Sequence, residues 1–123
     1  RFNEKYMGFR GLTMYKLTNT KQYKKDARAM AKQGKDRQKL VDILEKLANG
    51  IPLDIKHKDH NLSNNWSGHR ECHIEPDWLL IYKIDKKANE LRLVRTGSHA
   101  ELFNESLQLS IKELNRQLSQ FID

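Results

Sequence analysis

An almost continuously apolar stretch, Trp78–Ile84, constrains the fold of this chain more than any other feature. A strand with one face in water alternates between apolar and polar residues, whereas an unbroken apolar run is typical of a strand buried on both faces. The stretch therefore predicts the central strand of a sheet that is covered on each side.

Two further strands are predicted around this one. Residues His69–Ile74 alternate in character, and Leu91–Thr96 returns after the polar loop Asp85–Asn89. The tripeptide Glu75-Pro76-Asp77 has turn chemistry, because proline pre-sets the backbone angle of a turn and aspartate tolerates its conformation. In the first of these strands, one face is predicted to carry Arg70, Cys72 and Ile74, and the other His69, Glu71 and His73.

Helices are predicted before these strands. A short strand at Tyr15–Thr18 precedes an amphipathic helix from Thr20 to Gln33, which Gly34 ends. Asp36 has the character of an N-cap for a second helix, which ends at Gly50. The predicted fold is α+β, with an N-terminal αα-hairpin packed on a small, twisted, mainly antiparallel sheet. A chain of 123 residues is long enough for one such domain.

The two ends of the chain are predicted to lie outside this domain. Residues 1–13 precede Met14 and form an N-terminal extension, residues 14–103 form the domain, and residues 104–123 form a C-terminal amphipathic helix. The helix packs either on the core or on a second chain. Packing on the core is favoured because the heptad spacing continues for too few turns to predict a coiled coil. Its apolar residues are Leu107, Ile111, Leu114, Leu118 and Phe121.

Charge is distributed unevenly along the chain. Residues 1–58 contain 15 Lys and Arg against 6 Asp and Glu, a balance of +9, whereas residues 59–123 contain 8 against 10, a balance of −2. The basic part is either a surface that binds a nucleic-acid backbone or a solvated helix face that maintains solubility. The single cysteine, Cys72, excludes an internal disulfide, and no apolar run is long enough to span a membrane. A cytoplasmic location is expected.

All five histidines fall between His57 and His99, together with Asp77 and Arg95. Histidine is the side chain that both accepts and donates a proton near neutral pH. Beside arginines in a chain with a net charge of +7, such residues favour cleavage of an anionic backbone, and RNA is the favoured substrate.

Several blocks of the sequence resemble the YafQ branch of the RelE/ParE toxin superfamily. They are Lys58-Asp59-His60, Trp66–Arg70, His73–Trp78 and Arg95–Phe103, and they match in order and spacing. The resemblance implies a RelE-like fold and a ribosome-dependent mRNA endonuclease that belongs to a toxin–antitoxin system. It also implies an acidic antitoxin as partner, with DNA bound only through that antitoxin. The active-site residues that it implies are His60, His73, Asp77, Trp78, Arg95, His99 and Phe103. His69 stands where such toxins commonly have an aromatic residue.

The same residues suit RNA cleavage on chemical grounds. RNA carries its own nucleophile, the 2′-hydroxyl, so a protein supplies a base, an acid and a cation around one phosphate. His99 is predicted to be the general acid, and Arg95 is predicted to hold phosphate oxygens. Ser98 and Glu101 fit a capping box, which predicts a helical turn at His99. The general base remains open among His60, His73 and Asp77.

Trp78 and Phe103 are predicted to stack on unpaired bases, and Arg70 is grouped with them as a substrate-binding residue. Plainer alternatives remain open for several residues. They are His60 as a polar loop residue, His73 as a residue on a solvated sheet face, Asp77 as a turn residue, Trp78 as a core residue, and Arg95 as only the partner of a carboxylate. The His-x-x-His pair at His57 is too weak to predict zinc, so no metal and no cofactor is predicted.

Two other functions remain open. A ParE-like protein would keep the fold and inhibit DNA gyrase without catalysis, and it would not need clustered histidines. A non-catalytic RNA- or ribosome-binding module would explain the basic charge but not the sequence around His99. Cleavage of a defined mRNA on ribosomes separates these functions from an endoribonuclease.

Overall fold

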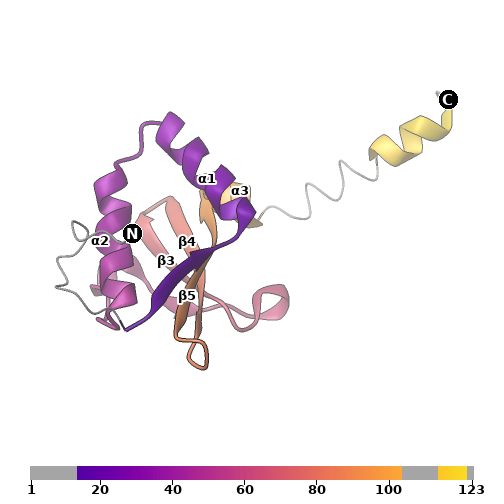
Figure 1. Cartoon of the computed structure of the whole chain (residues 1–123). Helices are drawn as coiled ribbons and strands as arrows, with labels where there is room; N and C mark the ends of the chain where they lie inside the picture. The colour runs from indigo at the N-terminus through magenta and orange to yellow at the C-terminus, as the bar shows by residue number, and fades with distance from the viewer. Residues whose placement is uncertain (1–13, 104–113, 122–123) are drawn as a thin grey trace.

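The structure is a computed structural model that describes residues 14–103 and 114–121. Over these ranges, two helices lie between the first strand and a run of later strands, which confirms the predicted α+β class (Figure 1). No helix within these ranges is both long enough and apolar enough to cross a membrane. The predicted extension at residues 1–13 lies outside the described residues.

The sheet has five strands in the order β1-β5-β4-β3-β2. Strand β4 (Trp78–Asp85) is central, and it pairs antiparallel with β3 (Arg70–Glu75) and β5 (Glu90–Gly97). The short strand β2 (His60–Asn61) adds antiparallel to β3, while β1 (Lys16–Asn19) pairs parallel with β5. The mainly antiparallel sheet is confirmed, although the alternation pattern predicted neither β2 nor the parallel pairing of β1.

Both hairpin helices begin where the sequence predicts, and Asp36 is the predicted cap of the second. The side chain of Thr20 accepts a hydrogen bond from the Tyr23 N–H at the start of α1 (Lys21–Lys32). Asp36 accepts a hydrogen bond from the Gln38 N–H at the start of α2 (Arg37–Ala48). These side chains satisfy N–H groups that have no partner inside the helix, so the sequence alone locates the helix starts.

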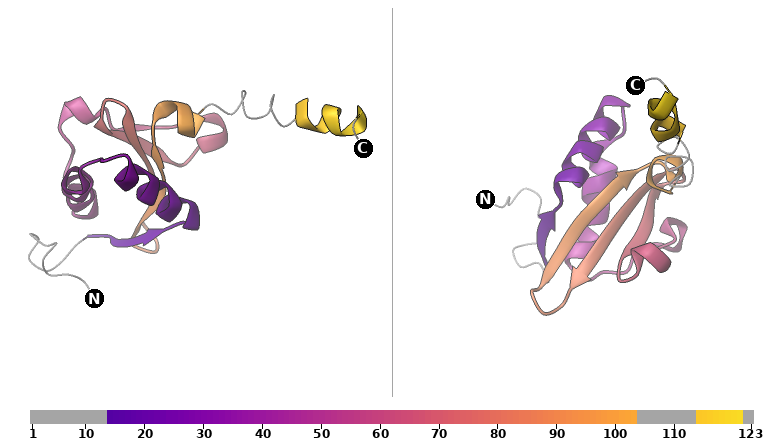
Figure 2. Two further views of the ribbon diagram at one scale, coloured as in Figure 1. Left: turned by 90° about the horizontal axis from the view of Figure 1, so that it is seen from above. Right: turned by 90° about the vertical axis from the view of Figure 1, so that its right-hand side faces the viewer.

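Strand β4 is apolar from Trp78 to Tyr82 because each face of this part of the strand belongs to a different core. Leu80 and Tyr82 point to the side covered by the α1–α2 hairpin, where Met30 and Leu47 pack. Leu79 and Ile81 point to the opposite side, where they meet Leu102, Trp66 and Phe103. Figure 2 shows the hairpin on one side of the sheet and the α3 helix (His99–Phe103) on the other. The prediction that this strand is buried on both faces is confirmed for Trp78–Tyr82, whereas Lys83 is exposed.

The C-terminal segment departs from the favoured prediction. Residues 114–121 are helical, and residues 104–113 lie outside the described part of the chain. Leu114, Leu118 and Phe121 are 54%, 44% and 85% exposed. In the described helix, therefore, these side chains do not pack on the domain core, and a heptad pattern alone did not distinguish a core helix from a separate one.

Candidate active site

Two of the predicted histidines meet on the face of the sheet opposite the hairpin. His60 on β2 and His73 on β3 lie on either side of the buried carboxylate of Glu71. Their Nε2 atoms lie 3.5 and 3.7 Å, respectively, from Glu71 Oε1. The strand period of two explains this arrangement, because Glu71 and His73 share a face of β3 and His60 pairs directly with Glu71.

The other ring nitrogen of each histidine faces a backbone carbonyl. His60 Nδ1 lies 2.6 Å from the Lys58 carbonyl oxygen, and His73 Nδ1 lies 3.2 Å from that of Pro76. A carbonyl only accepts hydrogen bonds, so the proton belongs on Nδ1 in both rings. Both Nε2 atoms face Glu71.

The β3–β4 turn connects His73 to the start of α3. Asp77 lies in this turn, and its Oδ1 accepts a hydrogen bond of 3.0 Å from the His99 N–H. The predicted capping box is also present: the Ser98 N–H donates to Glu101 Oε1, and the Glu101 N–H donates to Ser98 Oγ. Together these bonds hold the exposed His99 at the first position of the short helix.

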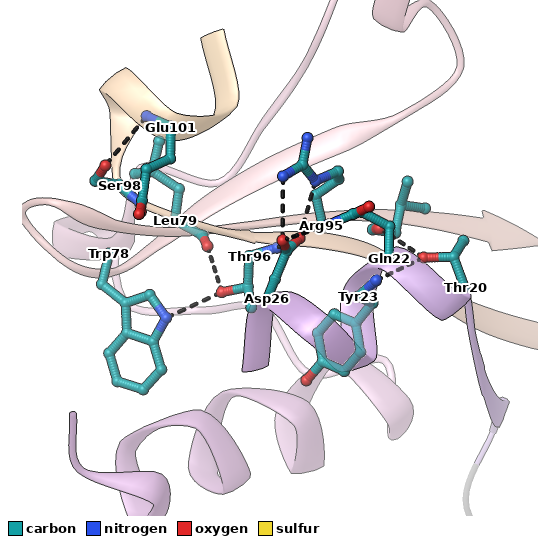
Figure 3. Close-up of polar contacts among 11 residues, drawn as sticks. Thr20, Gln22, Tyr23, Asp26, Trp78, Leu79, Arg95, Thr96, Ser98 and Glu101 are labelled. Carbon is teal, nitrogen blue, oxygen red and sulfur yellow. Dashed lines mark hydrogen bonds and ion pairs between the residues drawn. The ribbon is translucent and has the colours of Figure 1, made fainter. Parts of the chain in front are cut away.

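Arg95 is held by Asp26, a buried residue of α1 (Figure 3). Arg95 Nε and Nη2 donate to the two Asp26 oxygens over 2.8 and 3.1 Å. Asp26 Oδ2 also accepts a hydrogen bond from the Thr96 N–H at 3.1 Å. Strand β1 pairs with β5 only as far as Leu93. Beyond that point, the Asp26 carboxylate accepts a hydrogen bond from the backbone N–H of Thr96 in place of a neighbouring strand. Arg95 therefore pairs with a carboxylate, as the plainer alternative predicts.

Burial and hydrogen bonding act in opposite directions on Asp26. Burial by itself raises the pKa of this carboxyl group, but hydrogen bonds from Arg95, Gln22 and the Thr96 N–H outweigh it and lower the pKa below its ordinary value of 3.8. Asp26 therefore remains ionised and paired over the whole neutral range.

Trp78 belongs to the hairpin-side core. It is 2% exposed, and its indole N–H donates to Thr96 Oγ1 over 2.9 Å (Figure 3). The same hydroxyl donates to the Leu79 carbonyl over 2.7 Å. A buried ring on this side of the sheet offers no surface to a base, so the placement argues against the predicted stacking of Trp78 on RNA.

Arg70 is also separated from the histidines, because it shares the hairpin-side face of β3 with Cys72 and Ile74. Its guanidinium donates to Asp59, Asn61 and the Tyr82 hydroxyl. The structure therefore does not bring it together with His60 and His73. The neighbouring Cys72 is fully buried, and burial raises the pKa of its thiol, so it stays protonated and acts as a strand residue.

Phe103, by contrast, lies beside a predicted catalytic residue. Its ring centroid is 5.0 Å from that of His99 on α3. The structure therefore groups the predicted residues into two neighbouring sets on one face: His60 with His73, and Asp77 with His99 and Phe103. Within the described ranges, no three His, Cys, Asp or Glu residues are placed to hold a metal ion.

Sequence reasoning missed two acidic residues, Glu71 and Asp26. Glu71 alternates in phase with His73, so its position between two histidines follows from the strand period once β2 is known. Asp26 stands three residues after Tyr23 and four before Met30, on the apolar face of a helix. An acidic residue in that phase signals a buried partner of opposite charge, because unpaired charges are rarely buried.

Similarity to known proteins is concentrated in the α+β domain. The family described as a bacterial toxin of type II toxin–antitoxin systems, YafQ, matches residues 15–104. The chain is 47% identical over 83 residues to the mRNA interferase toxin YafQ of Escherichia coli K12. That match spans 67% of this chain and 88% of the E. coli protein.

Solved structures show the same similarity. The toxin of the E. coli DinJ–YafQ toxin–antitoxin complex superimposes with a TM-score of 0.67 and 42% identity, over 73% of this chain and 98% of that chain. A metal-bound toxin from Helicobacter pylori superimposes with a TM-score of 0.70 and 43% identity, over 73% of this chain and 100% of its own. Each superposition spans nearly the whole of the solved toxin chain.

Replacing Asp26 by Asn tests the connection between α1 and Arg95. We expect the free energy of unfolding near pH 7 to fall by about 1.5–3 kcal/mol, because charged hydrogen bonds are removed. The folded-state pKa of Asp26 is lowered, so its stabilisation is present above the ordinary value of 3.8 and disappears as the pH falls through the folded pKa. The difference in stability between the wild-type protein and the variant should therefore shrink as the pH falls below 3.8, as measured by urea unfolding at neutral and at acidic pH.

The matched control is Asp42→Asn on the exposed side of α2. It should change the free energy of unfolding by no more than about 0.5 kcal/mol. If Asp26→Asn lowered the free energy of unfolding by the same amount at neutral and at acidic pH, the role of the ionised carboxylate would be contradicted.

Proposed function

This chain belongs to the YafQ family of toxins of type II toxin–antitoxin systems, and on that premise we propose that it is an endoribonuclease that cleaves mRNA on the ribosome. The resemblance predicted from the histidine and arginine blocks is confirmed by the family match over residues 15–104. Residues 14–103 are proposed as the toxin domain, with residues 1–13 and 104–123 as additions to it. A toxin that acts on translating mRNA would act in the cytoplasm.

One observation carries the catalytic part of the proposal. The Nε2 atoms of His60 and His73 face Glu71, and the backbone of His99 is fixed on the same face through Asp77. Acid–base cleavage of RNA needs two proton-transfer groups on opposite sides of one phosphate. A gyrase inhibitor or a non-catalytic RNA-binding module has no need of this arrangement.

The proposed reaction uses the 2′-hydroxyl of the RNA as nucleophile. His60 or His73 accepts the hydroxyl proton on Nε2 as the O2′ atom attacks phosphorus. The bond between phosphorus and O5′ breaks, and protonated His99 donates its proton to that oxygen. The products are a 2′,3′-cyclic phosphate and a free 5′-hydroxyl. Asp77 is the weaker candidate for the base, because its Oδ1 already holds the His99 N–H.

Arg95 is proposed to stabilise the negative charge that develops on the phosphate. The Nε and Nη2 atoms of Arg95 donate to Asp26, which leaves its Nη1 atom as the donor for a phosphate oxygen. A guanidinium held in this way loses little conformational freedom when it binds the transition state. Phe103 is retained as a proposed substrate-binding residue, whereas the placements of Trp78 and Arg70 favour structural roles.

The exposed face of α1 is proposed to bind the phosphate backbone of ribosomal RNA. The only acidic residue of this helix, Asp26, is buried, so no exposed carboxylate offsets the basic residues there. Clustered cations gain affinity for RNA by releasing the counterions around it. The basic residues on this face are Lys21, Lys24, Lys25, Arg28 and Lys32.

We also propose that an acidic antitoxin neutralises this protein. The E. coli relative forms a complex with the antitoxin DinJ. A partly disordered acidic chain can wrap a large basic surface and gains association rate from the opposite charge. No DNA binding by the toxin alone is proposed.

Replacement of His99 by Ala is the main test of catalysis. Loss of a positioned acid should reduce the cleavage rate of a defined mRNA on purified ribosomes by about 10²–10⁴-fold. Lys87→Ala, in the exposed β4–β5 loop, is the control and should cleave at the wild-type rate. Cleavage by folded His99→Ala protein at the wild-type rate would remove His99 from the mechanism. A wild-type protein that leaves mRNA intact but inhibits gyrase would favour the alternative function.

The chemistry of the product ends tests the nucleophile. We expect a cyclic or 3′-phosphate and a free 5′-hydroxyl, because the attacking oxygen belongs to the RNA. EDTA should not slow cleavage when ribosomal magnesium is buffered separately. Products with 5′-phosphate ends would indicate attack by water, assisted by a metal, and would contradict the scheme.

The double variant Lys24→Glu/Arg28→Glu tests the basic face of α1. Ribosome binding should weaken, and the slope of log affinity against log salt should become shallower by about 1 for each phosphate that the variant no longer neutralises. Lys86→Glu/Lys87→Glu makes the same change of charge in the β4–β5 loop and should keep the wild-type slope. Equal slopes for all three proteins would place the RNA-binding surface elsewhere.

A further inference from the structure

Four rings form a continuous row on the active-site face. Trp66 lies in the middle, with its ring centroid 5.4 Å from that of His69 and 6.4 Å from that of Phe103. Phe103 continues the row to His99, at 5.0 Å. The row therefore begins in the β2–β3 loop and ends at the proposed general acid.

Trp66, together with Leu62, packs the β2–β3 loop on this face of the sheet. It ends the short helical turn η3 (Asn64–Trp66) and packs on the core formed by Leu79, Ile81 and Leu102. Trp66, His69 and Phe103 are all partly exposed, so the row is supported by the sheet and still reaches the surface. It contrasts with Trp78, whose ring lies in the opposite core.

The indole N–H of Trp66 distinguishes it further. This nitrogen is buried and has no hydrogen-bond partner within the described part of the chain. Buried donors are nearly always paired, and an unpaired one destabilises the folded state. The N–H of Trp78, by contrast, is paired with Thr96. An acceptor that reaches Trp66 through a small shift of the ring would remove this penalty.

Partly exposed aromatic rings next to an acid–base site suit an unpaired nucleobase. Proteins recognise single-stranded RNA by stacking its bases on aromatic side chains and by contacting the base edges. Because Phe103 touches both His99 and Trp66, a nucleotide whose 5′ oxygen lies at His99 places its neighbouring base along the row.

We propose that Trp66 and His69 bind the nucleobase next to the cleaved phosphate and determine which bases are accepted there. Trp66 supplies the stacking surface, and His69 supplies a polar contact to the base edge. His69 Nδ1 faces the Ser67 carbonyl at 3.4 Å, which leaves Nε2 for that contact. The inference rests on the proposed ribonuclease function and adds the part of the site that selects its substrate.

The test maps cleavage positions on a ribosome-bound mRNA that offers every codon, using full-length wild-type protein, Trp66→Leu and His69→Phe. Trp66→Leu should lower kcat/KM at the preferred codons by on the order of 10- to 100-fold through a higher KM, with the pH profile of cleavage unchanged. His69→Phe keeps the ring beside Trp66 but removes its polar atoms. It should therefore cleave with a changed order of base preference.

Leu62→Ala is the matched structural control, because Leu62 packs on the same core without contributing a ring. It should lower the unfolding temperature and keep the wild-type order of codons. Folded Trp66→Leu and His69→Phe proteins that cleave the same codons in the same order would overturn the inference. In that case wild-type cleavage would still support the ribonuclease function, whereas absence of wild-type cleavage would contradict that function itself.

Discussion

Burial of β4 on both faces is the constraint on which the rest of the structure depends. Leu80 and Tyr82 pack against the helical hairpin, and Leu79 and Ile81 pack against α3 and the loop that carries Trp66. Each fully buried side chain of this size contributes about 1.5–3 kcal/mol, so one strand stabilises both layers. The active-site face is therefore supported by the same strand that holds the hairpin. A polar residue at any of these four positions would disturb one layer or the other.

Asp26 connects helix α1 to strand β5, beyond the point where β1 ends. Its carboxylate satisfies a β5 backbone N–H where β1 has ended, and it also fixes the guanidinium of Arg95. The adjacent Thr96 hydroxyl accepts from Trp78 and donates to the Leu79 carbonyl. A single buried acid in α1 therefore positions a residue proposed for catalysis, and the energetic reason is that burial of its charge requires several donors.

The two sides of the molecule carry different chemistry. The hairpin side presents a basic helix whose only acid is buried, whereas the opposite side collects histidines, Glu71 and a row of aromatic rings. This division matches the uneven charge along the chain, because residues 1–58 include the α1–α2 hairpin and residues 59–123 include every described strand except β1. Under the proposed function, the basic helix attracts the phosphate backbone and the opposite face cleaves it, so one RNA contacts both surfaces.

The local features of this protein follow from its sequence. Thr20 and Asp36 cap helices because their side chains satisfy free N–H groups of the next turn, and Ser98 with Glu101 does the same at α3. The central strand follows from its apolar run, and the family follows from motifs whose spacing is readable along the chain. The candidate residues His60, His73, Asp77 and His99 were named from those motifs, and the structure places them on one face.

Tertiary structure alone decided which side chains meet across the chain. The pairing of β1 with β5, the position of Glu71 between two histidines, the contact of Asp26 with Arg95 and the core position of Trp78 all join segments distant in sequence. The motifs marked Trp78 for RNA and assigned no role to Trp66, although Trp66 begins one of the matching blocks, because burial depends on which face of which strand a ring meets. Such contacts depend on strand order and register, which local propensity does not encode.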